Sequence, residues 1–226
     1  MSVFANYING EWVTGPTFEN RNPAYTDDLA GEFVKGSAAD VDAAAAAAEA
    51  AFPAWSSMAG PARGNLLYKV ADILDRKFDQ VAADMTREEG KTLPEGIGEA
   101  ARAGHIFKFF AGEVLRMTGD KVPSVRPGID VEVTREPVGV VGLITPWTFP
   151  IAIPAWKIAP ALAYGNTVVM KPADLVPGCA WALADILARA GIPAGVFNLV
   201  MGRGSIVGEV LVNDPGVAAL SFTGSV

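Results

Sequence analysis

The sequence predicts an α/β fold built on a doubly wound parallel sheet, with a β-hairpin segment that projects from it. From residue 137 onward, short apolar runs alternate with helical stretches, and strands joined by helical crossovers form parallel sheets covered on both faces. Before residue 117, long amphipathic stretches predict helices. Between these regions, a Pro- and Gly-containing segment followed by alternation at Val131 and Val133 predicts a strand or hairpin.

The composition excludes several classes of protein. The 226 residues are 50% hydrophobic and 19% charged, with a net charge of −7 and no cluster of Lys and Arg, which argues against nucleic acid or a membrane as partner. No apolar run reaches the roughly 18 residues of a membrane-spanning helix, and no signal-peptide pattern is present, so we expect a cytoplasmic protein. The single Cys179 and the single His105 argue against a metal site.

The first 116 residues are expected to form an amino-terminal helical part. Candidate strands lie around Asn6–Trp12 and Gly31–Val34 and are separated by a turn-rich stretch. Ser37 and Asp40 fit a capping box, which predicts the start of a helix, and Pro53 is expected to end it.

Two further helices are predicted in this part. Apolar residues recur on one face between Leu66 and Met85, and a second helix is expected from about Pro94 to Leu115. His105 lies in the second helix and is expected to be an ordinary helical residue, because no cysteine or acidic cluster accompanies it. The inward face of the second helix is predicted to carry Ile97, Ala101, Phe109 and Phe110.

Residues 117–136 are expected to form the projecting segment, and residues 137–226 a Rossmann-like part that is truncated. Exposed strands such as those of the projecting segment invite pairing with another chain. In the Rossmann-like part, the chain reaches Val226 where a strand would pass to its next helix, so we expect a truncated domain. The predicted strands are Val138–Ile144, Thr167–Met170, Phe197–Met201 and Ala219–Phe222, and the predicted helices are Ile151–Tyr164, Ala180–Ala190 and Ser205–Val212.

The loops after these four strands carry the strongest signal of a functional site. All four should lie at one edge of the sheet, where doubly wound proteins bind nucleotides. Gly224 lets a phosphate approach the backbone, and Ser225 would open a helix whose free N–H groups attract a pyrophosphate. Lys171 and Asp174 offer a donor and an acceptor for ribose hydroxyls.

Three glycines form a near-match to the dinucleotide fingerprint. Gly202, Gly204 and Gly208 are spaced G-x-G-x-x-x-G, one residue longer than the fingerprint itself. The alternative interpretation is a glycine turn that leads into a helix.

The ordered segments TPWTFPIAIPAWKIAPALAYGNTVVMKPAD, GIPAGVFNLVMG and SFTGS resemble the amino-terminal portion of the aldehyde dehydrogenase superfamily. Its members carry PWNFP, a KP-[SA]-E-like segment and FTGS in this order. The resemblance covers essentially the whole chain, including INGEW near the start and EEGK at Glu88 to Lys91. Within the superfamily, the chain is most similar to α-ketoglutaric semialdehyde (2,5-dioxovalerate) dehydrogenases.

The resemblance implies NAD or NADP as cofactor and assigns residues to it. Pro146 and Trp147 would contact the nicotinamide half, Lys171 and Asp174 the adenosine ribose, and Ser225 the pyrophosphate. The choice between NAD and NADP stays open, because Asp174 can accept from a free 2′-hydroxyl whereas Lys171 could accommodate a 2′-phosphate. The implied cofactor-binding residues are Thr145, Pro146, Trp147, Lys171, Pro172, Ala173, Asp174, Gly202, Gly224 and Ser225.

The implied activity is oxidation of an aldehyde, such as α-ketoglutaric semialdehyde, to a carboxylate through a thiohemiacetal and a thioester on a cysteine. Thr148 stands where the family has the asparagine that holds the oxyanion. The resemblance assigns residues 1–116 and 137–226 to the cofactor domain and implies that the catalytic domain is absent, so that the family's nucleophilic cysteine and its general base, a glutamate, would lie beyond Val226. Cys179 is expected to be a structural thiol, so this chain alone should be inactive.

The remaining implications concern partners and rival functions. A small-molecule aldehyde is the expected substrate, and the intact protein is expected to be a homodimer or homotetramer. Two alternatives stay open: a non-catalytic nucleotide-binding module that retains this half of the fold, and a CoA-acylating relative of the family.

Overall fold

A six-stranded sheet runs through the centre of the molecule in the order β11-β8-β9-β10-β2-β3. The computed structural model describes residues 3–225, so Met1, Ser2 and Val226, at the outer ends of the first and last predicted segments, lie outside the described residues. The strands of the sheet are β2 (Asn6–Ile8), β3 (Glu11–Val13), β8 (Val140–Ile144), β9 (Thr167–Lys171), β10 (Phe197–Leu199) and β11 (Val217–Phe222).

The four strands of the carboxyl-terminal half are parallel, as the sequence predicts. The chain passes from β8 to β9 to β10 and then returns to β11 on the other side of β8. This reversal of direction is the topological switch point of a doubly wound sheet. The predicted fold class is therefore confirmed, with the addition that β2 and β3 extend the sheet in the antiparallel sense.

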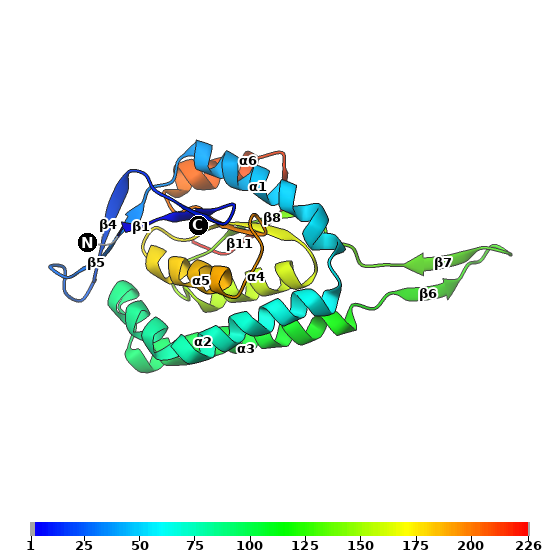
Figure 1. Cartoon of the computed structure of the whole chain (residues 1–226), viewed down its shortest axis with the longest axis horizontal. Helices are drawn as coiled ribbons and strands as arrows, with labels where there is room; N and C mark the ends of the chain where they lie inside the picture. Colours follow the sequence, from blue (N-terminus) through cyan, green and yellow to red (C-terminus); the bar gives the residue numbers. More distant parts are fainter. Residues whose placement is uncertain (1–2, 226) are drawn as a thin grey trace.

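Helices cover both faces of the sheet (Figure 1). On one side lie α1 (Ala38–Ser57) and α6 (Glu209–Asn213), and on the other α4 (Ala152–Ala163) and α5 (Pro177–Arg189). A long pair of helices, α2 (Gly60–Glu89) and α3 (Leu93–Glu113), packs against α4 and α5 from outside. The short helices η1 (Val114–Arg116) and η2 (Gly204–Gly208) follow α3 and precede α6.

The first predicted strand is a hairpin, because the chain reverses within it. Asn9 and Gly10 both have positive φ, 52° and 83°, the backbone of a tight two-residue turn that suits an Asn-Gly pair. Strands β2 and β3 therefore pair with each other, and β2 also pairs with β10. The turn-rich stretch after them contains the strand β4, which sequence reasoning missed, and which joins a separate sheet of β1 (Val3–Phe4), β4 (Thr17–Arg21) and β5 (Leu29–Val34).

Two predictions about the helices were wrong in detail. The capping box of Ser37 and Asp40 is present, but α1 continues through Pro53 to Ser57, because the next turn buries Trp55, which is 1% exposed. In α3, Phe109 is 57% exposed instead of inward-facing, and Ile97, Ala101 and Phe110 are only partly buried. Close packing on α2 selects small side chains, so the buried face of α3 carries Gly96, Glu99, Ala100, Ala103, Gly104, Phe107 and Ala111.

The predicted projecting segment contains an antiparallel hairpin of β6 (Asp120–Pro123) and β7 (Asp130–Val133). Every residue of both strands is exposed, and the hairpin extends away from the body of the molecule (Figure 1). A two-stranded ribbon buries too little apolar surface to be stable by itself. Within the described residues, nothing covers its exposed valines, Val122, Val131 and Val133.

The turn at Gly10 provides a test of the hairpin between β2 and β3. Gly10→Ala is expected to lower the free energy of unfolding by about 1–2 kcal/mol, because φ is positive and an added Cβ would lie 2.8 Å from the Cβ of Ala194. Gly98→Ala is the control: it lies in α3 with open space around the new methyl group, so a gain of about 0.5–1 kcal/mol is expected. Equal unfolding midpoints of the two variants in urea would contradict this account.

Candidate functional site

The carboxyl ends of β11, β8 and β9 lie side by side. Phe222, Ile144 and Lys171 are register neighbours across the three strands. Beyond them, the Thr145 N–H donates to the carbonyl of Lys171 at 3.2 Å, and the Thr223 N–H donates to the carbonyl of Ile144 at 3.0 Å. The loops that the sequence assigns to the site therefore begin at one edge of the sheet, at its switch point.

Lys171 and Asp174, predicted to act together, form an ion pair at this edge. The Nζ of Lys171 lies 2.8 Å from Oδ1 of Asp174. The lysine side chain is 7% exposed whereas the aspartate side chain is 38% exposed. The buried cation thus fixes a carboxylate that remains accessible to a ligand.

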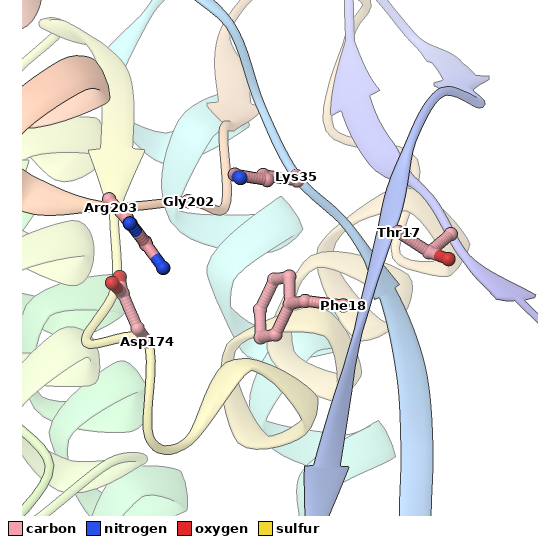
Figure 2. A pocket seen from close by; sticks show the side chains of 6 residues that line it. All are labelled: Thr17, Phe18, Lys35, Asp174, Gly202 and Arg203. Carbon is pink, nitrogen blue, oxygen red and sulfur yellow. The ribbon is translucent and has the colours of Figure 1, made fainter.

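A cavity of about 180 Å³ lies next to this pair, between the ends of β9 and β10 and the strand β4. Gly202 closes one side with a φ of 138°, and an added Cβ there would lie 2.9 Å from a methyl group of Val207. Figure 2 shows the ring of Phe18 and the charged ends of Arg203 and Lys35 around the same space as Asp174. The lining residues are Thr17, Phe18, Lys35, Asp174, Gly202 and Arg203.

Sequence reasoning placed Asp174 and Gly202 at this cavity edge but missed the other four residues. Thr17 and Phe18 belong to β4, which was not predicted, and Lys35 follows β5. Only the tertiary fold brings these segments, about 140 or more positions before Asp174, to the cavity. Arg203 could have been noticed, since it directly follows Gly202.

The loop from Thr145 to Pro150 follows β8 and is held in place by Lys91. Thr145 and Pro146 are buried, whereas Trp147, Thr148 and Phe149 are exposed at the surface of the edge. Lys91 donates to the carbonyl of Thr148 at 3.1 Å, and its Nζ also lies 4.6 Å from the centroid of the Phe149 ring. Lys91, the lysine of the EEGK segment, therefore fixes the backbone of the loop at Thr148.

Glu99 connects this lysine to the start of α4. Its Oε2 lies 2.5 Å from Nζ of Lys91, and its Oε1 accepts from the N–H groups of Ile151 and Ala152 at 2.9 and 3.0 Å. A carboxylate at a helix amino terminus satisfies N–H groups that lack partners in the helix and favours the positive end of the helix dipole. Glu99 carried no recognisable signal in the sequence, because a glutamate in a helix is usually solvated.

Glu88 has the same relation to α5. It accepts from the N–H groups of Gly178 and Cys179 at 2.6 and 2.8 Å, and from the side chain of Asn20 at 2.9 Å. The carboxyl is buried, which raises its pKa. Burial, with the nearby Glu88, also raises the pKa of the Cys179 thiol well above its usual value, so the prediction of a structural thiol is supported by an environment that opposes thiolate formation.

A lysine of α4 was also missed. Lys157 donates to the hydroxyl of Ser221 in β11 at 2.7 Å, and partial burial lowers its pKa. The contact ties α4 to the strand at the switch point.

The other predicted residues lie at the edge without meeting at the cavity. Pro172 is buried and Ala173 half-buried between Lys171 and Asp174, while Gly224 and Ser225 are exposed after β11. No helix follows β11 within residues 3–225, so the predicted helix start at Ser225 has no counterpart in the described part. Gly204 and Gly208 bound the π-turn η2 instead of opening an α-helix directly.

The described residues contain no group of three or more His, Cys, Asp or Glu side chains arranged to hold a metal ion, and His105 is exposed on α3. None of the described helices has the length and apolar character needed to cross a membrane.

The architecture is that of the doubly wound α/β proteins that place ligands at the carboxyl edge of the sheet. The family model described as "Aldehyde dehydrogenase family" matches residues 12–226. The chain therefore belongs to the aldehyde dehydrogenase family.

Named relatives agree with this membership. The chain is 49% identical to the α-ketoglutaric semialdehyde dehydrogenase of Bacillus subtilis, over 99% of this chain and 46% of that protein. Among solved structures, it superposes on an NADP-dependent enzyme of E. coli with a TM-score of 0.96 and 40% identity, over 98% of this chain and 46% of that one. An NAD-dependent aldehyde dehydrogenase of Sinorhizobium meliloti gives a TM-score of 0.96 and 36% identity, over 99% and 46%. The chain thus spans about half the length of these relatives.

The raised pKa of Glu88 predicts a pH dependence of stability. The folded protein holds the proton of Glu88 more tightly than the unfolded chain, so this stabilisation is complete below the ordinary pKa of 4.5 and is lost as the pH rises through the folded pKa. We expect the free energy of unfolding of the wild type, minus that of Glu88→Gln, to fall as the pH rises from 4.5, as measured by urea denaturation.

Glu95→Gln is the matched control for this measurement. Hydrogen bonds from Thr92 lower the pKa of Glu95, so its stabilisation is present above pH 4.5 and is lost as the pH falls through the folded pKa. The free energy of unfolding of the wild type, minus that of Glu95→Gln, should therefore decrease as the pH falls. If the free energy of unfolding of the wild type, minus that of Glu88→Gln, rose with pH, Glu88 would not be a buried carboxyl group with a raised pKa.

Proposed function

We propose that the protein containing this chain oxidises an aldehyde to a carboxylate, with NAD or NADP bound along the carboxyl edge of the sheet. The observation that carries the proposal is the cavity where Asp174, held by Lys171, faces Gly202 beside the switch point. Family membership supplies the reaction class. The relatives named above, NAD- and NADP-dependent, support the cofactor.

The residues at the edge suit the adenosine half of such a cofactor. Asp174 presents an accessible carboxylate that can accept from ribose hydroxyls, and the Phe18 ring offers an apolar face for a base (Figure 2). Gly202 lines the same cavity, and its positive φ together with the close packing of Val207 and Gly36 restricts this position to glycine. When bound, the nicotinamide supplies the acceptor for a hydride.

Charges at the cavity leave both cofactors possible. Asp174 favours the free 2′-hydroxyl of NAD, whereas Lys35 and Arg203 line the same cavity and could pair with the 2′-phosphate of NADP. Lys171 already pairs with Asp174, which makes it a less available phosphate ligand than Lys35 or Arg203. Lys35 and Arg203, and not Lys171, are therefore the residues proposed to bind the 2′-phosphate of NADP.

Thr148 is proposed to donate to the oxygen of the reacting carbonyl. Its side chain is exposed at the edge, and its carbonyl is fixed by Lys91. A hydroxyl donor aimed at developing negative charge stabilises an oxyanion, although it is shorter than the carboxamide of the family's asparagine. Trp147 and Pro146 precede it and are proposed to face the nicotinamide half.

The nucleophilic thiolate is proposed to come from outside residues 1–226, together with the general base. Cys179 is the only cysteine of the chain, and it is buried with a raised pKa at the start of α5. A thiol in that environment is not activated for attack on a carbonyl. The chain by itself should therefore bind the cofactor without oxidising aldehydes.

Two finer proposals concern substrate and assembly. The name of the Bacillus subtilis relative supports a semialdehyde, α-ketoglutaric semialdehyde in particular, as substrate. The exposed hairpin of β6 and β7 supports assembly into a homodimer or homotetramer, in which another copy covers Val122, Val131 and Val133.

Cofactor binding tests the proposed site. Lys171→Met is expected to weaken binding of NAD+ or NADP+ roughly tenfold or more, because it removes the charge-assisted bond that holds Asp174. Dissociation constants can be measured from quenching of tryptophan fluorescence, with Lys121→Met on the exposed hairpin as the control. Equal dissociation constants for wild type and Lys171→Met would count against the adenosine site.

Aldehyde oxidation by the complete protein tests the role of Thr148. Thr148→Ala should lower kcat by about 10²-fold with cofactor affinity unchanged, because one oxyanion donor is lost, while Thr148→Asn should keep or raise kcat. The readout is the rate of NADH or NADPH formation. A Thr148→Ala enzyme with the kcat of the wild type would exclude the oxyanion role, and a wild-type protein that binds the cofactor but oxidises no aldehyde would favour a non-catalytic module.

A further inference from the structure

A second cavity, of about 470 Å³, adjoins the loop that carries Thr148. It opens between α3 and α4, on the side of Phe149, the residue next to Thr148. Its lining consists of Glu95, Gly98, Glu99, Arg102, Phe149, Ala152 and Trp156. A molecule in this cavity would thus lie against Phe149, the sequence neighbour of the residue proposed to hold the reacting carbonyl.

The walls of this cavity combine apolar surface with one unpaired cation. Phe149 and Trp156 present large exposed rings, 51% and 42% exposed, that suit a short carbon chain. Arg102 lies one helical turn beyond Glu99 on α3, on the same side of the helix. Gly98 leaves open space at its own position, since an added Cβ would meet nothing within 4 Å.

The other charged groups near the cavity are already engaged. Glu99 binds Lys91 and the amino terminus of α4, and Lys91 also lies 3.3 Å from Glu89. Glu95 accepts from the N–H and the hydroxyl of Thr92. Arg102, in contrast, forms no ion pair within 4.0 Å among residues 3–225.

We propose that Arg102 binds the carboxylate at the far end of a semialdehyde substrate and thereby selects acidic aldehydes over neutral ones. The chain of the substrate would lie against Phe149 and Trp156 with its aldehyde end at Thr148. A guanidinium can bind a carboxylate with two parallel hydrogen bonds, which fixes its orientation as well as its position. This inference rests on the proposed aldehyde oxidation and adds the group that recognises the substrate.

The experiment compares two aldehydes of equal chain length in the complete protein. One is 5-oxopentanoate, which carries a distal carboxylate, and the other is pentanal, which does not. Arg102→Gln is expected to lower kcat/KM for 5-oxopentanoate roughly 10- to 100-fold, mainly through KM, the effect of losing a charge-assisted bond. For pentanal the same variant should stay within about twofold of the wild type.

Two further variants make the outcome specific. Arg102→Lys keeps the charge and should recover part of the preference for 5-oxopentanoate over pentanal, since lysine pairs with a carboxylate as a point charge. Arg76→Gln is the matched control, because Arg76 is an exposed arginine of α2 outside the cavity. This variant should leave kcat/KM unchanged for both aldehydes. Thermal unfolding of each variant checks that the fold is intact.

Three results would overturn the inference. If Arg102→Gln lowered kcat/KM equally for both aldehydes, or for neither, Arg102 would not recognise the carboxylate even though the proposed activity holds. If Arg102→Lys restored kcat/KM equally for both aldehydes, Arg102 would have a role in folding and not in recognition of the carboxylate. A wild-type protein that oxidises neither aldehyde, nor any other, would remove the proposed activity and this inference with it.

Discussion

Three buried charged side chains of the α2 and α3 pair sit at the ends of other helices, and the rest of the fold depends on them. Arg63 donates to the carbonyl of Ala163 at 3.0 Å at the end of α4 and to carbonyls at the end of α1, Met58 among them. Glu99 and Glu88 accept from N–H groups at the starts of α4 and α5. Each side chain is opposite in sign to the partial charge of the helix end that it contacts, and it forms hydrogen bonds with backbone N–H or carbonyl groups that have no partner within the helix.

This arrangement explains how the outer helical layer can position the sheet edge that is proposed to bind the cofactor. Helix α4 is held at both ends by the outer pair, so the loop before it starts from a fixed point, and Lys91 extends the same network to the carbonyl of Thr148. Glu88 and Asn20 do the same at α5, where Asn20 also donates to the carbonyl of Leu175, next to Asp174. Buried charges of this kind are costly unless fully paired, and here the backbone supplies most of the partners.

Much of the fold could be predicted from local patterns. The four parallel strands, the helices between them and the capping box at Ser37 follow from periodicity and from residue types that act over a few positions. The errors arose where distant packing decided. Helix α1 passes Pro53 because Trp55 is buried beyond it, and α3 turns small residues toward α2 because the two helices lie close together, which leaves Phe109 outside. Hydrophobicity alone assigns Phe109 to the core.

The sequence by itself determined the class of fold, the family and the loops that are proposed to form the site, because those signals lie in short segments whose spacing along the chain is informative. The tertiary structure alone decided which side chains share a cavity. Phe18 and Lys35 meet Asp174 and Arg203 only after β4 and β5 are laid beside the sheet edge, and Arg102 reaches Phe149 only after α3 packs on α4. Contacts between segments so far apart depend on the packing of whole elements, and no local pattern encodes them.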